Sequence, residues 1–112
     1  MGVTAENRRE TLITDEDDIY LASRAMKAMA HPLRLKILCI LGGSSEVSVQ
    51  DIVERVGTSQ SNISQHLSIL RDKGILAFRK DANRVYYRIG DTRIVLLINA
   101  LREAFCGNRG NH

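Results

Sequence analysis

The chain has 112 residues, which is enough for one compact domain and too few for two. About 44% of the residues are apolar, 26% are charged and only 4% are aromatic, which excludes a disordered or collagen-like chain and favours packed helices over a β-sandwich. The net charge of +3 is uneven: residues 1–18 carry six acids against two arginines, and the remainder carries fourteen Lys and Arg against seven Asp and Glu. That basic remainder favours a polyanionic partner such as nucleic acid.

The chain shows no sign of a membrane or secreted protein. No run reaches the roughly 18 consecutive apolar residues that a membrane span needs, and the first residues lack the basic-then-apolar pattern of a signal peptide. We therefore expect a cytoplasmic protein without a membrane partner. In that reducing compartment Cys39 and Cys106 are expected to be thiols at rest.

The first half of the chain predicts a tail and two helices. Residues 1–14 have no apolar period and are expected to form a flexible N-terminal tail. A helix over about 16–29 is indicated by clustered acids ahead of an apolar stripe. A second helix, Pro32 to Leu41, follows His31 as its cap, with proline at the first helical position, and Gly42 ends it.

The second half predicts a helix-turn-helix over about 47–73. Ser48 caps a two-turn helix that Gly57 closes, and Thr58 or Ser59 caps a longer helix that ends before Gly74. The alternating residues 75–90, interrupted by turn formers, indicate a two-stranded hairpin.

A last helix is predicted over about 91–106, with a C-terminal tail at 107–112. This helix is apolar on more than one face, so we expect a second subunit to cover it together with the helix at 16–29, giving a homodimer. The predicted fold is therefore mainly α (α+β), one winged helix-turn-helix domain over 15–106.

The outward face of the second helix of the motif carries no charge from Ser59 to Leu70. A merely solvated helix usually carries Glu and Lys there, whereas hydroxyls and amides can donate to and accept from base edges in the major groove of double-stranded DNA. We predict that Gln60, Ser61, Ser64 and Gln65 read sequence, and that Ser59 and His66 meet the backbone. The alternative is a solvated polar face that makes no contact with DNA.

The hairpin adds positive charge beside this uncharged face. Arg79, Lys80 and Arg84 are predicted to meet phosphates or an adjacent minor groove at the tip of the wing. The alternative is a solvated hairpin tip that needs polar residues in any case.

Three segments together resemble a known family. Residues 30–38 read AHPLRLKIL, residues 59–71 read SQSNISQHLSILR and residues 84–89 read RVYYRI. They are similar to the ArsR/SmtB family, and the resemblance covers about residues 17–106. It implies a winged-helix dimer that binds a palindromic operator and blocks transcription until an inducer binds.

The metal sites that the family resemblance implies are not matched. A cysteine-rich site would lie at the start of the helix before the reading helix, where this chain has Val49–Ile52, and the Asp-x-His site on the last helix is replaced by Asp91–Arg93. Two lone cysteines rarely complete a soft-metal site. We therefore expect neither a metal nor another cofactor, although a metal-sensing or effector-free regulator stays open as an alternative.

The two cysteines are the remaining candidates for a sensor. Cys39 and Cys106 resemble the cysteine pair of the BigR/SqrR/HlyU subgroup, for which the resemblance implies that reactive sulfur species or oxidants join the thiols and release DNA. Nearby arginines favour a thiolate at Cys106, whereas the apolar surroundings of Cys39 disfavour one, which makes Cys106 the expected first nucleophile. The alternative is that Cys39 is a small core residue and Cys106 has no role.

Two other function classes are alternatives to a DNA-binding regulator. An enzyme or thiol reductase is disfavoured because the chain has no Cys-x-x-Cys, no nucleophile with a spaced base and no Gly-rich phosphate loop, so no catalytic residues are expected. A helix-turn-helix used only for protein contact stays open and predicts no salt-dependent duplex binding.

Overall fold

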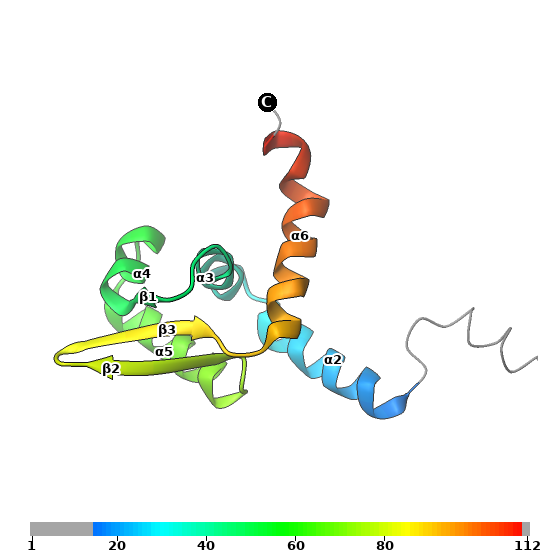
Figure 1. Cartoon of the computed structure of the whole chain (residues 1–112), viewed down its shortest axis with the longest axis horizontal. Coiled ribbons are helices and arrows are strands. Elements are labelled where there is room, and N and C mark those ends of the chain that lie inside the picture. Colours follow the sequence, from blue (N-terminus) through cyan, green and yellow to red (C-terminus); the bar gives the residue numbers. More distant parts are fainter. Residues whose placement is uncertain (1–14, 111–112) are drawn as a thin grey trace, which may run out of the picture.

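The structure is a computed structural model that describes the backbone of residues 15–110 and the side chains of residues 15–106. Within these residues, helices surround a small antiparallel sheet (Figure 1). In chain order the elements are α2 (Glu16–Met29), α3 (Pro32–Gly42), β1 (Val47–Ser48), α4 (Val49–Val56), α5 (Gln60–Asp72), β2 (Leu76–Asp81), β3 (Arg84–Ile89) and α6 (Thr92–Gly110). The mainly α, winged helix-turn-helix fold is confirmed. The predicted tail at 1–14 and residues 111–112 lie outside the described part.

Local capping explains where the two helices of the motif begin and end. The Ser48 and Ser59 hydroxyls each accept a hydrogen bond from a backbone N–H of the first turn, at 3.2 Å, in α4 and α5. Gly57 ends α4 with φ 83°, a left-handed conformation that suits glycine, and its N–H donates to Val53 O at 2.9 Å. The turn between the helices is therefore set by short-range chemistry.

The wing is part of a three-stranded sheet, because a short strand pairs with one side of the predicted hairpin. The sheet order is β1-β3-β2, and β1 pairs antiparallel with β3, with Val47 opposite Tyr87. Phe78 in β2 lies opposite the same Tyr87. The sequence analysis did not predict β1, whose two residues tie the base of the wing to the start of α4.

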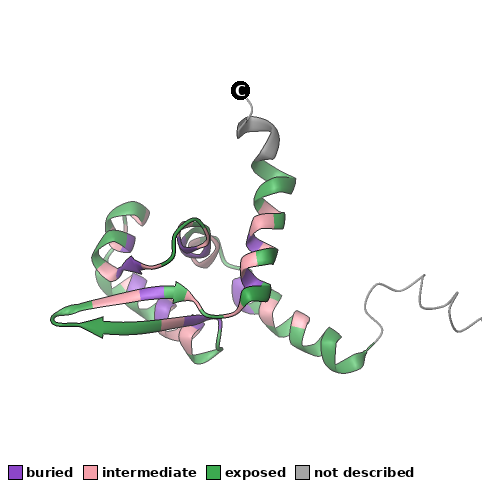
Figure 2. Cartoon of the chain, in the orientation of Figure 1, coloured by how far each residue is buried: buried purple, intermediate pink, exposed green. Residues whose placement is uncertain are grey.

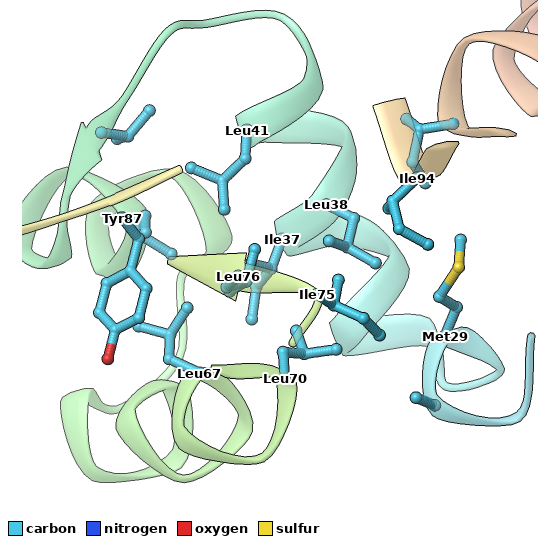
Figure 3. Packing of buried hydrophobic residues seen from close by; sticks show 14 of the residues in the cluster. Met29, Ile37, Leu38, Leu41, Leu67, Leu70, Ile75, Leu76, Tyr87 and Ile94 are labelled. Atoms are coloured by element: carbon cyan, nitrogen blue, oxygen red, sulfur yellow. The ribbon is translucent and has the colours of Figure 1, made fainter. Parts of the chain in front are cut away.

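The core lies where α3, α4 and α5 meet the base of the sheet. Side chains with less than 2% exposure come from all three helices, and β2, β3 and α6 close the cluster (Figure 3). The fully buried set is Ile37, Leu38, Leu41, Ile52, Ile63, Leu67 and Leu70. Because aliphatic burial is the main favourable term in folding, this cluster fixes α5 against the body of the domain.

The two end helices are only partly covered. In α2 the buried residues are Ala28 and Met29, both at its C-terminal end, and in α6 they are Ile94 and Ile98. Figure 2 shows that, up to residue 106, the other residues of both helices are largely exposed where the helices extend from the body. The predicted end of α6 at residue 106 is wrong, because the helix continues to Gly110. A glycine at 107 weakens a helix by about 1 kcal/mol but does not by itself stop one.

Candidate nucleic-acid interface

Helix α5 presents its polar residues outward because its apolar stripe is anchored in the core. Ile63, Leu67 and Leu70 are buried, at a spacing of three and four residues. The opposite side is solvent-exposed, and we call it the polar face of α5: Ser59, Gln60, Ser61, Ser64 and Gln65. These five residues are among the six of α5 and its cap that the sequence predicted to contact DNA. The structure brings them together at the N-terminal half of one helix.

The neighbouring Asn62 is held back from this face. It is half-buried, and its Nδ2 donates to the Thr58 hydroxyl at 3.3 Å in the turn before the helix. The side chain therefore stabilises the turn and is not presented with the polar face.

A groove separates α5 from the wing. It has a volume of about 320 Å³ and receives side chains from α4, α5 and the hairpin. Its polar lining is Gln50, Gln60, Ser64, Ser68, Asn83 and Arg84. The groove thus joins the predicted reading residues to a predicted phosphate contact, because Gln60 and Ser64 border the same hollow as Arg84.

Sequence reasoning did not include Gln50 or Asn83 among the site residues. Gln50 lies in the first turn of α4, and Asn83 lies in the hairpin turn, where the sequence suggested only a turn former. Only the tertiary contact of α4, α5 and the wing places these two amides on one groove. The sole available signal for Gln50 was an exposed amide at the start of the first helix of the motif.

Arg79 does not lie free at the wing tip as predicted. It lies within β2 and binds Glu46, with Nη2 to Oε1 at 2.6 Å and Nε to both carboxylate oxygens at 3.0 Å. Its guanidinium also stacks 4.6 Å from the centre of the Tyr86 ring. The Arg79 hydrogen bonds lower the pKa of Glu46, so this pair stays charged at neutral pH. The Glu46 carboxylate therefore offsets the charge that was expected to meet phosphate.

Lys80 and Arg84 lie close to the tip of the wing, and their contact with phosphate stays a prediction. Both are exposed near the turn formed by Ala82 and Asn83. Among the described residues neither has an ion pair within 4 Å, in contrast to Arg79. Their charges remain available to an anionic ligand beside the groove.

His66 is turned inward and is not part of the polar face. It is half-buried, its Nδ1 accepts a hydrogen bond from Arg34 Nε at 3.1 Å, and its ring centre lies 4.6 Å from that of His31. Its ring packs toward the start of α3, and the contact of His66 with the DNA backbone stays a prediction.

The two cysteines lie on different helices and both have exposed side chains. Cys39 is in α3, where its neighbours Ile37 and Leu38 point into the core, so it occupies the opposite side of the helix. The alternative that Cys39 is a core residue is thereby contradicted. Cys106 lies toward the C-terminal end of α6.

Helices α3 and α6, which carry the thiols, pack together at one close point. A Cβ added to Gly42 would lie 3.1 Å from Ile98 Cγ2, so glycine permits this approach. Cys106 lies eight residues beyond Ile98, roughly 12 Å further along the helix at 1.5 Å per residue.

The described residues offer neither a metal site nor a membrane span. Within the described side chains, no three His, Cys, Asp or Glu residues gather in a way that could hold a metal ion. None of the helices between residues 15 and 110 is long and apolar enough to cross a membrane.

The chain resembles known regulators in both sequence and structure. Residues 31–77 match the model of the arsR family of bacterial regulatory proteins. The HTH-type transcriptional regulator YgaV of Escherichia coli is 39% identical over 76% of this chain and 86% of its own length. The structure of HlyU from Vibrio cholerae matches with a TM-score of 0.78 at 38% identity, covering 82% of this chain and 99% of that one. The transcriptional repressor BigR from Xylella fastidiosa matches with a TM-score of 0.73 at 33% identity, covering 84% and 98%.

These relatives are named as transcriptional regulators, and the two solved structures share the fold described above over more than four fifths of this chain. The family match spans the end of the α2–α3 link through the start of the wing, which includes the whole polar face of α5. The chain therefore belongs to the ArsR family of bacterial regulatory proteins.

Proposed function

We propose that the protein is a dimeric transcriptional repressor that binds a palindromic operator through α5 and the wing, and that releases it when Cys39 and Cys106 react with reactive sulfur species or oxidants. The observation that carries the DNA-binding part is the uncharged, exposed polar face of α5 beside a groove that ends at Arg84. Hydroxyls and amides on a helix can read base edges, and flanking cations can bind phosphates.

An apolar hollow between α2 and α6 supports the dimer. Its volume is about 860 Å³, and its lining includes Leu21, Met26, Leu96 and Leu97. Met26 and Leu96 are 60% and 65% exposed, which is unusual for large apolar side chains. A second copy that packs its own α2 and α6 here would bury them on both chains at once, since a two-fold interface uses the same surface twice.

The exposure of both thiols supports the sensor. A thiolate at Cys106 would take the terminal sulfur of an organic persulfide and release the corresponding thiol, leaving a protein persulfide. The Cys39 thiolate would then attack the sulfur atom of the Cys106 side chain, expelling hydrosulfide and leaving a disulfide. If a second organic persulfide first transfers another sulfur atom to Cys106 and leaves as a thiol, attack of Cys39 on the middle sulfur expels hydrosulfide and leaves a trisulfide. Because the close contact of α3 and α6 lies at Gly42 and Ile98, a bridge further along α6 would draw its C-terminal half toward α3.

Such a movement would change DNA affinity through the dimer. Two recognition helices bind successive half-sites only when they are about one DNA turn apart, or a multiple of it. If α6 forms the dimer interface, then pulling it toward α3 rotates the two α5 helices relative to one another. The reduced protein is therefore the DNA-binding form in this proposal.

The test uses a duplex selected from a random-sequence pool by the reduced protein. Fluorescence anisotropy measures its binding by the wild type, by Cys39→Ser and by Cys106→Ser, before and after treatment with glutathione persulfide. We expect all three to bind when reduced, and only the wild type to release the duplex. Intact-protein mass spectrometry then counts the sulfur atoms in the bridge. Equal release by both variants would exclude the dithiol switch, and no duplex binding by the reduced wild type would exclude the DNA-binding role.

A further inference from the structure

A single arginine connects the end of α2 to the recognition helix α5. Arg34 is half-buried in the first turn of α3. Its Nη1 donates to the backbone oxygen of Ala28 at 3.0 Å, and its Nε donates to His66 Nδ1 at 3.1 Å. One guanidinium therefore spans three helices, two of which the proposed function assigns to different tasks: α2 to dimerisation and α5 to DNA.

The Ala28 end of this link is favourable for α2. Ala28 lies in the last turn of the helix, where carbonyl groups have no partner within the helix. A cation placed there satisfies one of these groups and opposes the negative end of the helix dipole. Arg34 thus fixes the C-terminus of α2, which is also the buried end of that helix.

The His66 end requires an uncharged imidazole. A neutral ring accepts a hydrogen bond at the nitrogen without a proton, whereas a charged ring has a proton on both nitrogens. Arg34 is always protonated, so its Nε can donate to His66 only while Nδ1 is bare. Protonation of His66 would place two donors and two positive charges against one another at a distance of 3.1 Å.

His31 adds to this constraint from the start of α3. Its ring centre lies 4.6 Å from that of His66, and its own Nδ1 is occupied by the Leu33 N–H at 3.1 Å, which caps α3. Burial, together with the nearby His31 and Arg34, lowers the pKa of His66 from its usual value. The charged groups that face His66 are thus basic, and they come from α3 and its cap.

From this geometry we infer that Arg34 and His66 are positioning residues that hold α5 in a fixed orientation to α2, and that protonation of His66 releases the link and weakens DNA binding in mild acid. The inference rests on the proposed function, because it takes α2 as a dimer helix and α5 as the DNA-reading helix. It assigns to the protein a response to pH that is independent of both cysteines.

The test measures the pH profile of DNA binding. The selected duplex is titrated with wild-type protein by anisotropy at constant ionic strength, from pH 7.5 to pH 5.5, under reducing conditions. The comparison variant is His66→Asn, because the Asn Oδ1 can accept from Arg34 in the place of Nδ1 but does not titrate. We expect wild-type affinity to fall progressively relative to this variant as the pH drops below about 6.5, and because the pKa of His66 is lowered from that value, the fall by pH 5.5 should not exceed about tenfold per subunit. The affinity of His66→Asn should follow a nearly flat profile.

Two further variants separate positioning from charge. Arg34→Lys keeps the charge but replaces the rigid guanidinium, whose separate nitrogens Nε and Nη1 bind His66 and Ala28, by one flexible ammonium nitrogen, so its affinity should already be lower at pH 7.5 and its profile flatter. Lys36→Gln is the matched control: Lys36 lies in the same helix and also donates to a backbone oxygen, that of Val56, at 3.3 Å. It should keep the wild-type pH dependence. Circular dichroism at both ends of the range verifies that each variant is folded.

The possible outcomes distinguish a failure of this inference from a failure of the proposed function. Coincident profiles for the wild type and His66→Asn, with tight binding at pH 7.5, would overturn the inference alone. Failure of the wild type to bind any selected duplex at pH 7.5 would contradict the proposed function, and the inference with it. A wild-type profile that falls with acid while the His66→Asn profile stays flat would support both.

Discussion

The contrast between two wing arginines gives a quantitative prediction about DNA binding. Arg84 borders the groove beside α5 and has no ion pair among the described residues, whereas Arg79 is bound by Glu46 through contacts of 2.6 and 3.0 Å. Only Arg84 should therefore neutralise a phosphate and release counterions from DNA. We therefore predict that Arg84→Gln lowers the salt dependence of binding and that Arg79→Gln, which removes the same charge from the same hairpin, leaves it nearly unchanged.

The size of the effect follows from counterion release. Each phosphate that a protein neutralises contributes about −0.9 to the slope of log K against log salt concentration. A dimer would lose two such contacts with Arg84→Gln, so the slope should become shallower by roughly 1.8. Between 50 and 200 mM salt, this difference corresponds to a roughly twelvefold smaller loss of affinity than in the wild type.

The assay is an anisotropy titration of the selected duplex at five salt concentrations. A third variant should change the slope in the opposite direction. Glu46→Gln removes the partner of Arg79, and the freed guanidinium can then bind a phosphate, so the slope for this variant should be steeper than that of the wild type. The reasoning would be refuted if Arg79→Gln and Arg84→Gln made the slope shallower by the same amount, because the ion pair with Glu46 would then have no effect on the availability of Arg79.

Three further predictions concern stability, each measured by urea unfolding of the reduced protein. Leu38→Ala removes a fully buried side chain and should lower the free energy of unfolding by about 3 kcal/mol; a loss below about 1 kcal/mol would contradict the core described here. Ala82→Gly should raise it by up to about 1 kcal/mol, because Ala82 has a φ of 56° at the hairpin turn, and a decrease would argue against that conformation. Because the pKa of His66 is lowered in the folded protein, the unfolded chain binds this proton more readily. The free energy of unfolding should therefore fall as the pH drops below about 6.5, the ordinary pKa of histidine. Removing the group with His66→Asn should flatten this decline, and an unchanged decline would assign it elsewhere.

The elements that local chemistry determines could be predicted from the sequence. Ser48 and Ser59 cap α4 and α5 as expected, and Gly57 and Gly74 end them in left-handed conformations. At Gly74, the N–H donates to Arg71 O and the next N–H reaches back to Leu70 O, which closes the helix within a few residues. Short-range signals of this kind are sufficient to place a helix-turn-helix along a chain.

Contacts between distant residues could not be predicted in the same way. Glu46 and Arg79 are 33 positions apart, and Arg34 and His66 are 32 apart. Nothing local in the sequence indicates either pair, yet each gives a predicted DNA-contacting residue a partner within the protein. The pairing of β1 with β3 was missed for the same reason, since a two-residue strand has no period of its own.

The side of α3 that carries Cys39 was also undetermined by the sequence. From Pro32 to Leu41 nearly every residue is apolar, so the helical period does not distinguish a buried face from an exposed one. Packing against α4, α6 and β3 selects Ile37, Leu38 and Leu41 for the core and leaves Cys39 exposed. The exposure of this thiol could therefore not be predicted from its apolar neighbours in the sequence.

The central claim, that α5 and the wing bind DNA, is tested most directly by nuclear magnetic resonance of the isotope-labelled, reduced protein with and without the selected duplex. The account predicts that the largest changes in amide chemical shift fall on residues 59–65 and 80–85, with small changes in the first turns of α2. Changes concentrated in α2 and α6, with residues 59–65 unaffected, would contradict it.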